Sequence, residues 1–164
     1  MNENMKHFWV LFFALYSSLC FSQDEIKISV SFNKEKELVL VNFRNDSDKL
    51  LGINKGSKGT NELDGSVVYL SGITKDNCLA ENITFLWEYD TINDRLVPFD
   101  KFTWISNHDH ACFAILLKGK DELLKLNEIK VQIRFMIMMP SQKQGKKFDI
   151  KIINTDIYEV PLNK

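Results

Sequence analysis

The feature that most constrains the fold is a strict alternation of apolar and polar residues near the C-terminus. Apolar residues occupy every second position from 129 to 137, and the positions between them begin as polar or charged. The apolar set is Ile129, Val131, Ile133, Phe135 and Ile137, and the polar set is Lys130, Gln132 and Arg134. Because successive side chains of a strand point to opposite faces, this pattern predicts a long β-strand with one face in a core.

Other segments carry a similar signal and divide the chain into short strands. Residues 26–32 alternate, whereas residues 38–43 are apolar on both sides and are expected in the middle of a sheet. Further strands are predicted at 50–53, 67–73, 83–89, 112–117 and 148–152, the last continuing to 160, with two short extended pieces between 95 and 105. Residues 119–126 predict one short connecting helix, with Asp121 as its N-cap.

Eight or nine short strands without a βαβ rhythm predict an all-β fold. The expected architecture is a two-sheet antiparallel β-sandwich that is immunoglobulin-like in a loose sense. The spacing of Cys78, Trp87 and Cys112 is too compact for the antibody-type pin of cysteine, tryptophan and cysteine. Residues 23–164 are sufficient for a single domain that needs no structural metal.

The first 22 residues predict a cleaved secretory signal peptide. Lys6 precedes an apolar run from Phe8 to Phe21, which is shorter than the roughly 20 residues that span a bilayer. Cys20 and Ser22 occupy the small-residue positions that a signal peptidase reads. The expected product is exported, periplasmic or secreted, with no transmembrane segment in the mature chain. Lipidation at Cys20 is a minor alternative, because the preceding Leu19 fits a lipobox poorly.

The charge balance implies no electrostatic partner. The formal net charge is −1 at pH 7, and loss of the first 22 residues leaves it unchanged because they contain one Lys and one Glu. A nucleic-acid-binding protein normally shows a basic excess or a Lys and Arg stripe. Nucleic acid is therefore not an expected partner.

Two cysteines remain after the predicted cleavage, Cys78 and Cys112. Export to an oxidising compartment predicts a disulfide between them. Such a bridge would contribute at most about 4 kcal/mol on the chain-entropy account. The alternative is two free thiols that pack as small apolar side chains.

The segment 107–112 contains both histidines of the mature chain. If it is extended, His108, His110 and Cys112 share one strand face, and two imidazoles with a thiolate form a partial shell for zinc or copper. The alternative is a polar turn that leads into a strand, with Cys112 buried or bridged. The two hypotheses compete, because a disulfide sulfur is not a thiolate ligand.

Aromatic and methionine residues suggest a second kind of site. Phe99, Phe102 and Trp104 are close in sequence and would form a stacking platform for a sugar if exposed, whereas aromatic residues of strands more often belong to a core. Met136, Met138 and Met139 lie at the end of the alternating strand. They predict an apolar contact with a loop or a partner rather than a copper site.

The sequence favours a non-enzymatic function. It contains neither a Gly-x-Ser-x-Gly elbow nor a His-Glu-x-x-His motif. The leading hypothesis is an exported β-sandwich that binds a protein or glycan through loops 54–65 and 104–110. The alternative is a periplasmic metal-binding protein that uses His108, His110 and Cys112, and a hydrolase is less favoured. The pattern identifies neither the ligand nor the oligomeric state.

Overall fold

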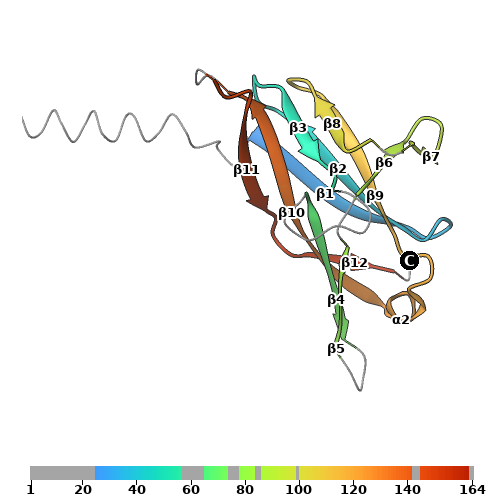
Figure 1. Ribbon diagram of the computed structural model, residues 1–164. Coiled ribbons are helices and arrows are strands. Elements are labelled where there is room, and N and C mark those ends of the chain that lie inside the picture. Colours follow the sequence, from blue (N-terminus) through green and yellow to red (C-terminus); the bar gives the residue numbers. More distant parts are fainter. Residues whose placement is uncertain are drawn as a thin grey trace, which may run out of the picture.

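The computed structural model describes residues 25–56, 65–73, 78–83, 86–98, 100–141 and 145–162. The predicted signal peptide and Cys20 lie outside these residues. The described chain forms two antiparallel β-sheets with one short helix, which confirms the predicted all-β sandwich (Figure 1). The finer immunoglobulin-like character stays a prediction. Within the described residues, no helix has the length and hydropathy required to cross a bilayer.

The first sheet, sheet A, has five strands in the order β1-β2-β9-β6-β7. Strand β2 lies between β1 and β9, as its two-sided apolar pattern predicts. The bounds of these strands are β1 Ile26–Asn33, β2 Leu38–Asn45, β9 His110–Leu116, β6 Trp87–Asp90 and β7 Arg95–Leu96.

The second sheet, sheet B, is organised around one long strand, β10. Its seven strands are β3 Leu51–Asn54, β4 Val67–Ile73, β5 Cys78–Ile83, β8 Phe102–Ile105, β10 Glu128–Pro140, β11 Phe148–Asn154 and β12 Tyr158–Pro161. Strands β4 and β11 both pair with Arg134 and therefore lie on opposite edges of β10. Strands β3 and β4 follow one edge of β10 in turn, and β11 and β12 follow the other.

Two sequence predictions about local structure are wrong. The predicted strand 83–89 is divided between β5 in sheet B and β6 in sheet A, and residues 84 and 85 lie outside the described chain. Helix α2 begins at Asp121 and ends at Leu124, so that Lys120 occupies the N-cap position and provides no side-chain cap. Asp121 therefore contributes an acidic residue to the first turn instead of capping it.

The core lies between the inner faces of the two sheets. Phe135 of β10 contacts Phe43 of β2 and Phe113 of β9, with ring centroids 5.2 Å and 6.3 Å apart. All three side chains are completely buried. These aromatic contacts join the central strands of sheet A to the central strand of sheet B.

A buried asparagine links the two sheets at one end of the sandwich. The side-chain nitrogen of Asn45, at the end of β2, donates to the carbonyl oxygens of Lys49, Ile105 and Ser106 at 2.7, 3.2 and 2.9 Å. Its side-chain oxygen accepts from the backbone N–H and hydroxyl of Ser47. Because Ile105 ends β8 of sheet B, this side chain joins the end of β2 in sheet A to the end of β8 in sheet B.

We expect Asn45→Ala to lower the free energy of unfolding by about 3 kcal/mol, because it leaves several buried groups without their partner. Urea unfolding of the purified protein measures this loss. Asn42→Ala is the matched control, since Asn42 is exposed on the same strand and its replacement should change stability by less than about 0.5 kcal/mol. Equal losses in the two variants would contradict the role of Asn45.

Candidate functional site

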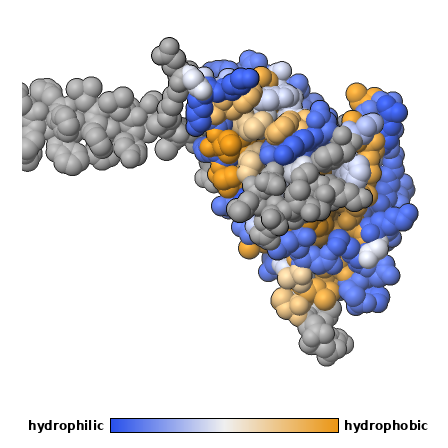
Figure 2. All heavy atoms as spheres, viewed as in Figure 1, coloured by the Kyte–Doolittle hydropathy of each residue, from blue (hydrophilic) through white to orange (hydrophobic). Residues whose placement is uncertain are grey.

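The outer face of sheet B is apolar at the end where β8, β3, β10 and β11 lie side by side. The register places Trp104 opposite Gly52, Gly52 opposite Met138, and Met138 opposite Ile150. We call this surface the Trp104 face and define it by its outward side chains: Trp104, Met136, Met138, Phe148, Ile150 and Ile152. Figure 2 shows hydrophobic residues gathered over β11 and the adjoining part of β10.

The large side chains of this face are exposed despite being apolar. Trp104 is 43% exposed, Phe148 38%, Ile150 60% and Ile152 45%. Met136 and Met138 lie between them and are half-buried. Contiguous exposed apolar patches are uncommon on folded domains, and interaction sites are one place where they occur.

The indole of Trp104 lies across a glycine. A Cβ placed on Gly52 would be 2.6 Å from Cζ3 of Trp104, so only glycine leaves room for the ring in this position. The ring reaches Phe148, with centroids 5.4 Å apart and planes inclined by 39°. Trp104 thereby covers the backbone of β3 and connects β8 with β11 above the sheet.

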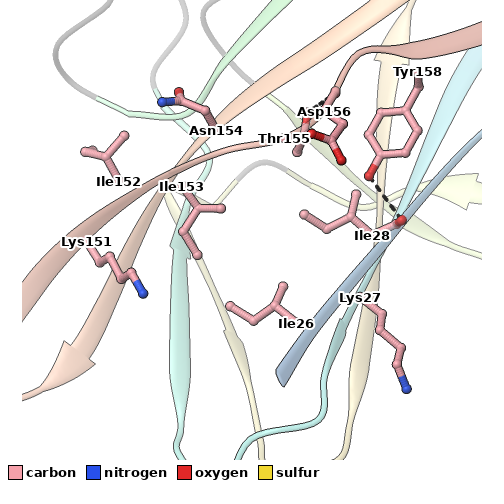
Figure 3. Close-up of a pocket in the computed structure, with 10 residues that line it drawn as sticks. All are labelled: Ile26, Lys27, Ile28, Lys151, Ile152, Ile153, Asn154, Thr155, Asp156 and Tyr158. Atoms are coloured by element: carbon pink, nitrogen blue, oxygen red, sulfur yellow. Dashed lines mark hydrogen bonds between the residues drawn. The ribbon is translucent and has the colours of Figure 1, made fainter. Parts of the chain in front are cut away.

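A groove separates the Trp104 face from the edge of sheet A. It has a volume of about 520 Å³ and lies between β1 and the strands β11 and β12. Figure 3 shows Ile26 and Ile28 on one side and Ile152 and Ile153 on the other. Tyr158 crosses one end of the groove, where its hydroxyl donates to the carbonyl oxygen of Ile28 at 3.2 Å.

The predicted metal ligands are not assembled into a site. Strand β9 begins at His110, and His108 lies in the preceding turn with a φ of 59°, so the two histidines do not share a strand face. Both imidazoles are exposed, whereas Cys112 is buried. His108 faces Asp48 at 3.6 Å. Among the described residues, no group of three or more His, Cys, Asp or Glu side chains is placed to hold a metal ion.

The predicted disulfide is not formed, because Cys78 and Cys112 are both free thiols. Cys78 is exposed on β5 of sheet B. Cys112 is buried on β9 of sheet A, where it packs with Leu38, Tyr89 and Ala114 apart from the main core. The two cysteines therefore belong to different sheets, and the core lies between them.

The aromatic residues predicted as a platform are partly on the exposed face. Phe102 and Trp104 point outward from β8, Trp104 exposed and Phe102 half-buried, while Thr103 between them is buried. Phe99 lies outside the described residues. Met136 and Met138 also point outward, as expected for a partner contact, whereas Met139 packs against the core.

Sequence reasoning missed three members of the Trp104 face. The sequence predicts a strand at 148–152 and assigns neither of its faces. The register with β10 places Phe148, Ile150 and Ile152 beside Met136, Met138 and Pro140 on the outer face. The sequence did contain a signal for the orientation of this strand, because Ile153 follows Ile152 directly. In the structure Ile153 packs against the core. Only one of two adjacent isoleucines can face inward.

Comparisons with known proteins add no family. No family model matches the chain, and no curated protein matches it. One solved structure, "Crystal structure of protein from Archaeoglobus fulgidus", is 10% identical and aligns over 83% of this chain and 94% of its own, with a TM-score of 0.30. A similarity at this level carries no argument about function.

We expect Gly52→Ala to displace the Trp104 ring and to lower the free energy of unfolding by about 1 to 2 kcal/mol, as overpacking does. In a Trp104→Ala background the new methyl group meets no ring. There the same replacement should change stability by less than about 0.5 kcal/mol. Urea unfolding of the four proteins in this cycle measures the coupling, and additive effects would contradict the contact.

We expect the two thiols to differ in reactivity. Burial raises the pKa of the Cys112 thiol from about 9 to about 11, so it remains protonated at neutral pH, and only the thiolate is alkylated readily. Iodoacetamide at pH 8 should label Cys78 in the folded protein and both residues in urea, as read by peptide mass mapping. Rapid labelling of Cys112 in the folded protein would contradict this burial.

Proposed function

We propose that the protein is an exported, non-enzymatic β-sandwich that binds an apolar segment of a partner protein on the Trp104 face. The observation that carries the proposal is the placement of six large apolar side chains on one outer sheet face, four of them substantially exposed. Export rests on the predicted signal peptide of residues 1–22.

The composition of the face suits a protein ligand. Tryptophan, phenylalanine and methionine are enriched in protein interfaces, and methionine adapts its shape to different partners. Trp104 is held by Gly52 and Phe148, so little rotamer freedom is lost when a ligand covers it. A rigid aromatic side chain surrounded by aliphatic residues is a typical binding hot spot of a protein interface.

The same composition suits a glycan poorly. Sugar hydroxyls require hydrogen-bonding groups around a stacking ring, yet the indole N–H of Trp104 is the one polar N–H or O–H group among the six side chains. The planes of Trp104 and Phe148 are inclined by 39°, so the rings do not form one flat platform. We therefore favour protein over glycan from the two ligand classes that the sequence suggested.

The experiment compares the immobilised protein with two single variants, using exported proteins of the source organism as prey. Trp104→Ser removes the centre of the face, and Ile73→Ser is the control because Ile73 is 77% exposed at the end of β4, beside the opposite end of β10 from the face. We expect a specific partner whose recovery falls at least about tenfold with Trp104→Ser and is unchanged with Ile73→Ser. Quantitative mass spectrometry measures recovery, and equal thermal midpoints establish that both variants fold.

Three results would contradict the proposal. Partners retained equally by wild type and Trp104→Ser would place binding elsewhere. Retention on insoluble polysaccharide that Trp104→Ser abolishes would identify a glycan as the ligand instead. Binding that disappears with chelator would favour the metal-dependent alternative.

A further inference from the structure

Among the described strands, β11 pairs with β10 alone. One hydrogen bond shows which backbone groups of β11 point away from β10. The N–H of Ser141 donates to the carbonyl oxygen of Lys147 at 3.1 Å, and these residues continue the β10–β11 register by one pair. In an antiparallel ladder hydrogen-bonded and non-hydrogen-bonded pairs alternate. Residues 149, 151 and 153 therefore bond to β10, and the backbone groups of residues 148, 150 and 152 point away from it.

The position of Pro140 supports this assignment. Pro140 has no N–H and lies opposite Phe148, which the alternation makes a non-hydrogen-bonded pair. At the other end of the β10–β11 ladder, the N–H of Thr155 donates to the carbonyl oxygen of Ile133 at 2.9 Å. The odd-numbered residues of β10 therefore bond toward β11 at both ends of the ladder. The outward-pointing N–H and C=O groups of β11 thus belong to the residues whose side chains form the Trp104 face.

The other edge strands of the described sheets are better protected. In β1 the carbonyl oxygen of Ile28 is covered by the Tyr158 hydroxyl, and the outward side chains are Lys27, Ser29 and Ser31. Strands β7, β8 and β12 have only two, four and four residues, and the six-residue β5 carries a charged residue, Glu81, which pairs with Lys120. Strand β11 has seven residues, with Ile150 and Ile152 exposed. Long apolar edges pair readily with further strands.

The space beside this edge accommodates a strand. The groove of about 520 Å³ adjoins Lys151, Ile152, Ile153 and Asn154 of β11 (Figure 3). Its opposite wall is formed by residues 26–28 of β1. A strand that extends sheet B beyond β11 would lie along this groove, and its inner side chains would contact the isoleucines of both walls.

We propose that β11 pairs with β11 of a second copy of this chain, in an antiparallel manner, about a two-fold axis at Ile150. Ile150 then lies opposite its symmetry mate, and Phe148 lies opposite Ile152 of the second copy. In these pairs the outward backbone groups meet and exchange hydrogen bonds. The interface is isologous, as a two-fold dimer requires.

The charges of Asp149 and Lys151 favour this register of the β11–β11 pairing over its neighbours. With the axis at Ile150, Asp149 lies opposite Lys151 of the second copy, and the same pair forms twice. Moving the axis by one residue opposes Asp149 to Asp149 or Lys151 to Lys151, which is unfavourable. Within its own chain Asp149 also contacts Lys146 at 2.9 Å, so in the dimer it would lie between two lysines.

The dimer joins the Trp104 faces of the two copies. Sheet B would continue through β11 into β11 of the second copy, and the outward residues 148, 150 and 152 of both would form one apolar surface. The interface of one seven-residue strand is small, so we expect a reversible dimer with a dissociation constant of about 10 to 100 µM. This inference does not rest on the proposed function, because the pairing is made by the backbone of β11, whereas Trp104 is on β8 and reaches β11 through its contact with the Phe148 ring.

The first test measures the mass of the full chain by sedimentation over a range of about 1 to 200 µM. We expect the mass to rise from monomer to dimer in the wild type. Ile150→Pro removes the central outward N–H and should abolish the dimer while preserving the fold, because that N–H does not bond to β10. Ile150→Val, which keeps the N–H, is the matched control and should dimerise.

The second test exchanges charges in the predicted pair. Asp149→Lys and Lys151→Asp each oppose like charges and should raise the dissociation constant about tenfold or more. The double variant Asp149→Lys with Lys151→Asp restores opposite charges and should dimerise like the wild type. A wild-type chain that is monomeric throughout, or a dimer that none of the variants weakens, would overturn the proposal. Trp104→Ser should leave the dimer intact, which separates this result from the test of the proposed function.

Discussion

The structure depends on the length of β10. Its thirteen residues provide enough edge for two strands in succession on each side, β4 and β3 on one and β12 and β11 on the other. Its inner residues, including the fully buried Phe135, connect this sheet to Phe43 and Phe113 of the opposite one. A single strand thus organises both the sheet and the core.

The same strand explains why the outer face of sheet B is polar at one end and apolar at the other. Toward its beginning the outward residues are Lys130, Gln132 and Arg134, and the surface is polar. Toward its end they are Met136 and Met138, flanked by β11 on one edge and by β3 and β8 on the other. Gly52 then lets Trp104 lie over the sheet. The apolar surface follows from strand register, not from a loop.

Much of the fold could be predicted from the sequence, because alternation depends on local geometry. The long strand 129–139, the mid-sheet position of residues 38–43 and the all-β class are all confirmed. The site was harder to predict, because alternation does not say which side of a strand faces the core when both strand neighbours are unknown. Phe148, Ile150 and Ile152 have the pattern of core residues and lie on the surface.

Pairings between distant residues were the least predictable part. Proximity in sequence suggested that His108, His110 and Cys112 could act together, but a turn ends before β9 begins and removes His108 from the strand. The expected link between Cys78 and Cys112 ignored which sheet each residue joins. Sheet membership is decided by contacts far along the chain, and composition and spacing do not encode it.

The most direct test of the central claim is photo-crosslinking in the organism that makes the protein. A photoreactive residue in place of Trp104 should form a covalent adduct with a different polypeptide, because the account makes this position the centre of a protein-binding face. The same residue in place of Ile73, which is 77% exposed at the opposite end of sheet B from the face, should form none. Absence of an adduct from position 104, or the same adduct from both positions, would contradict the account.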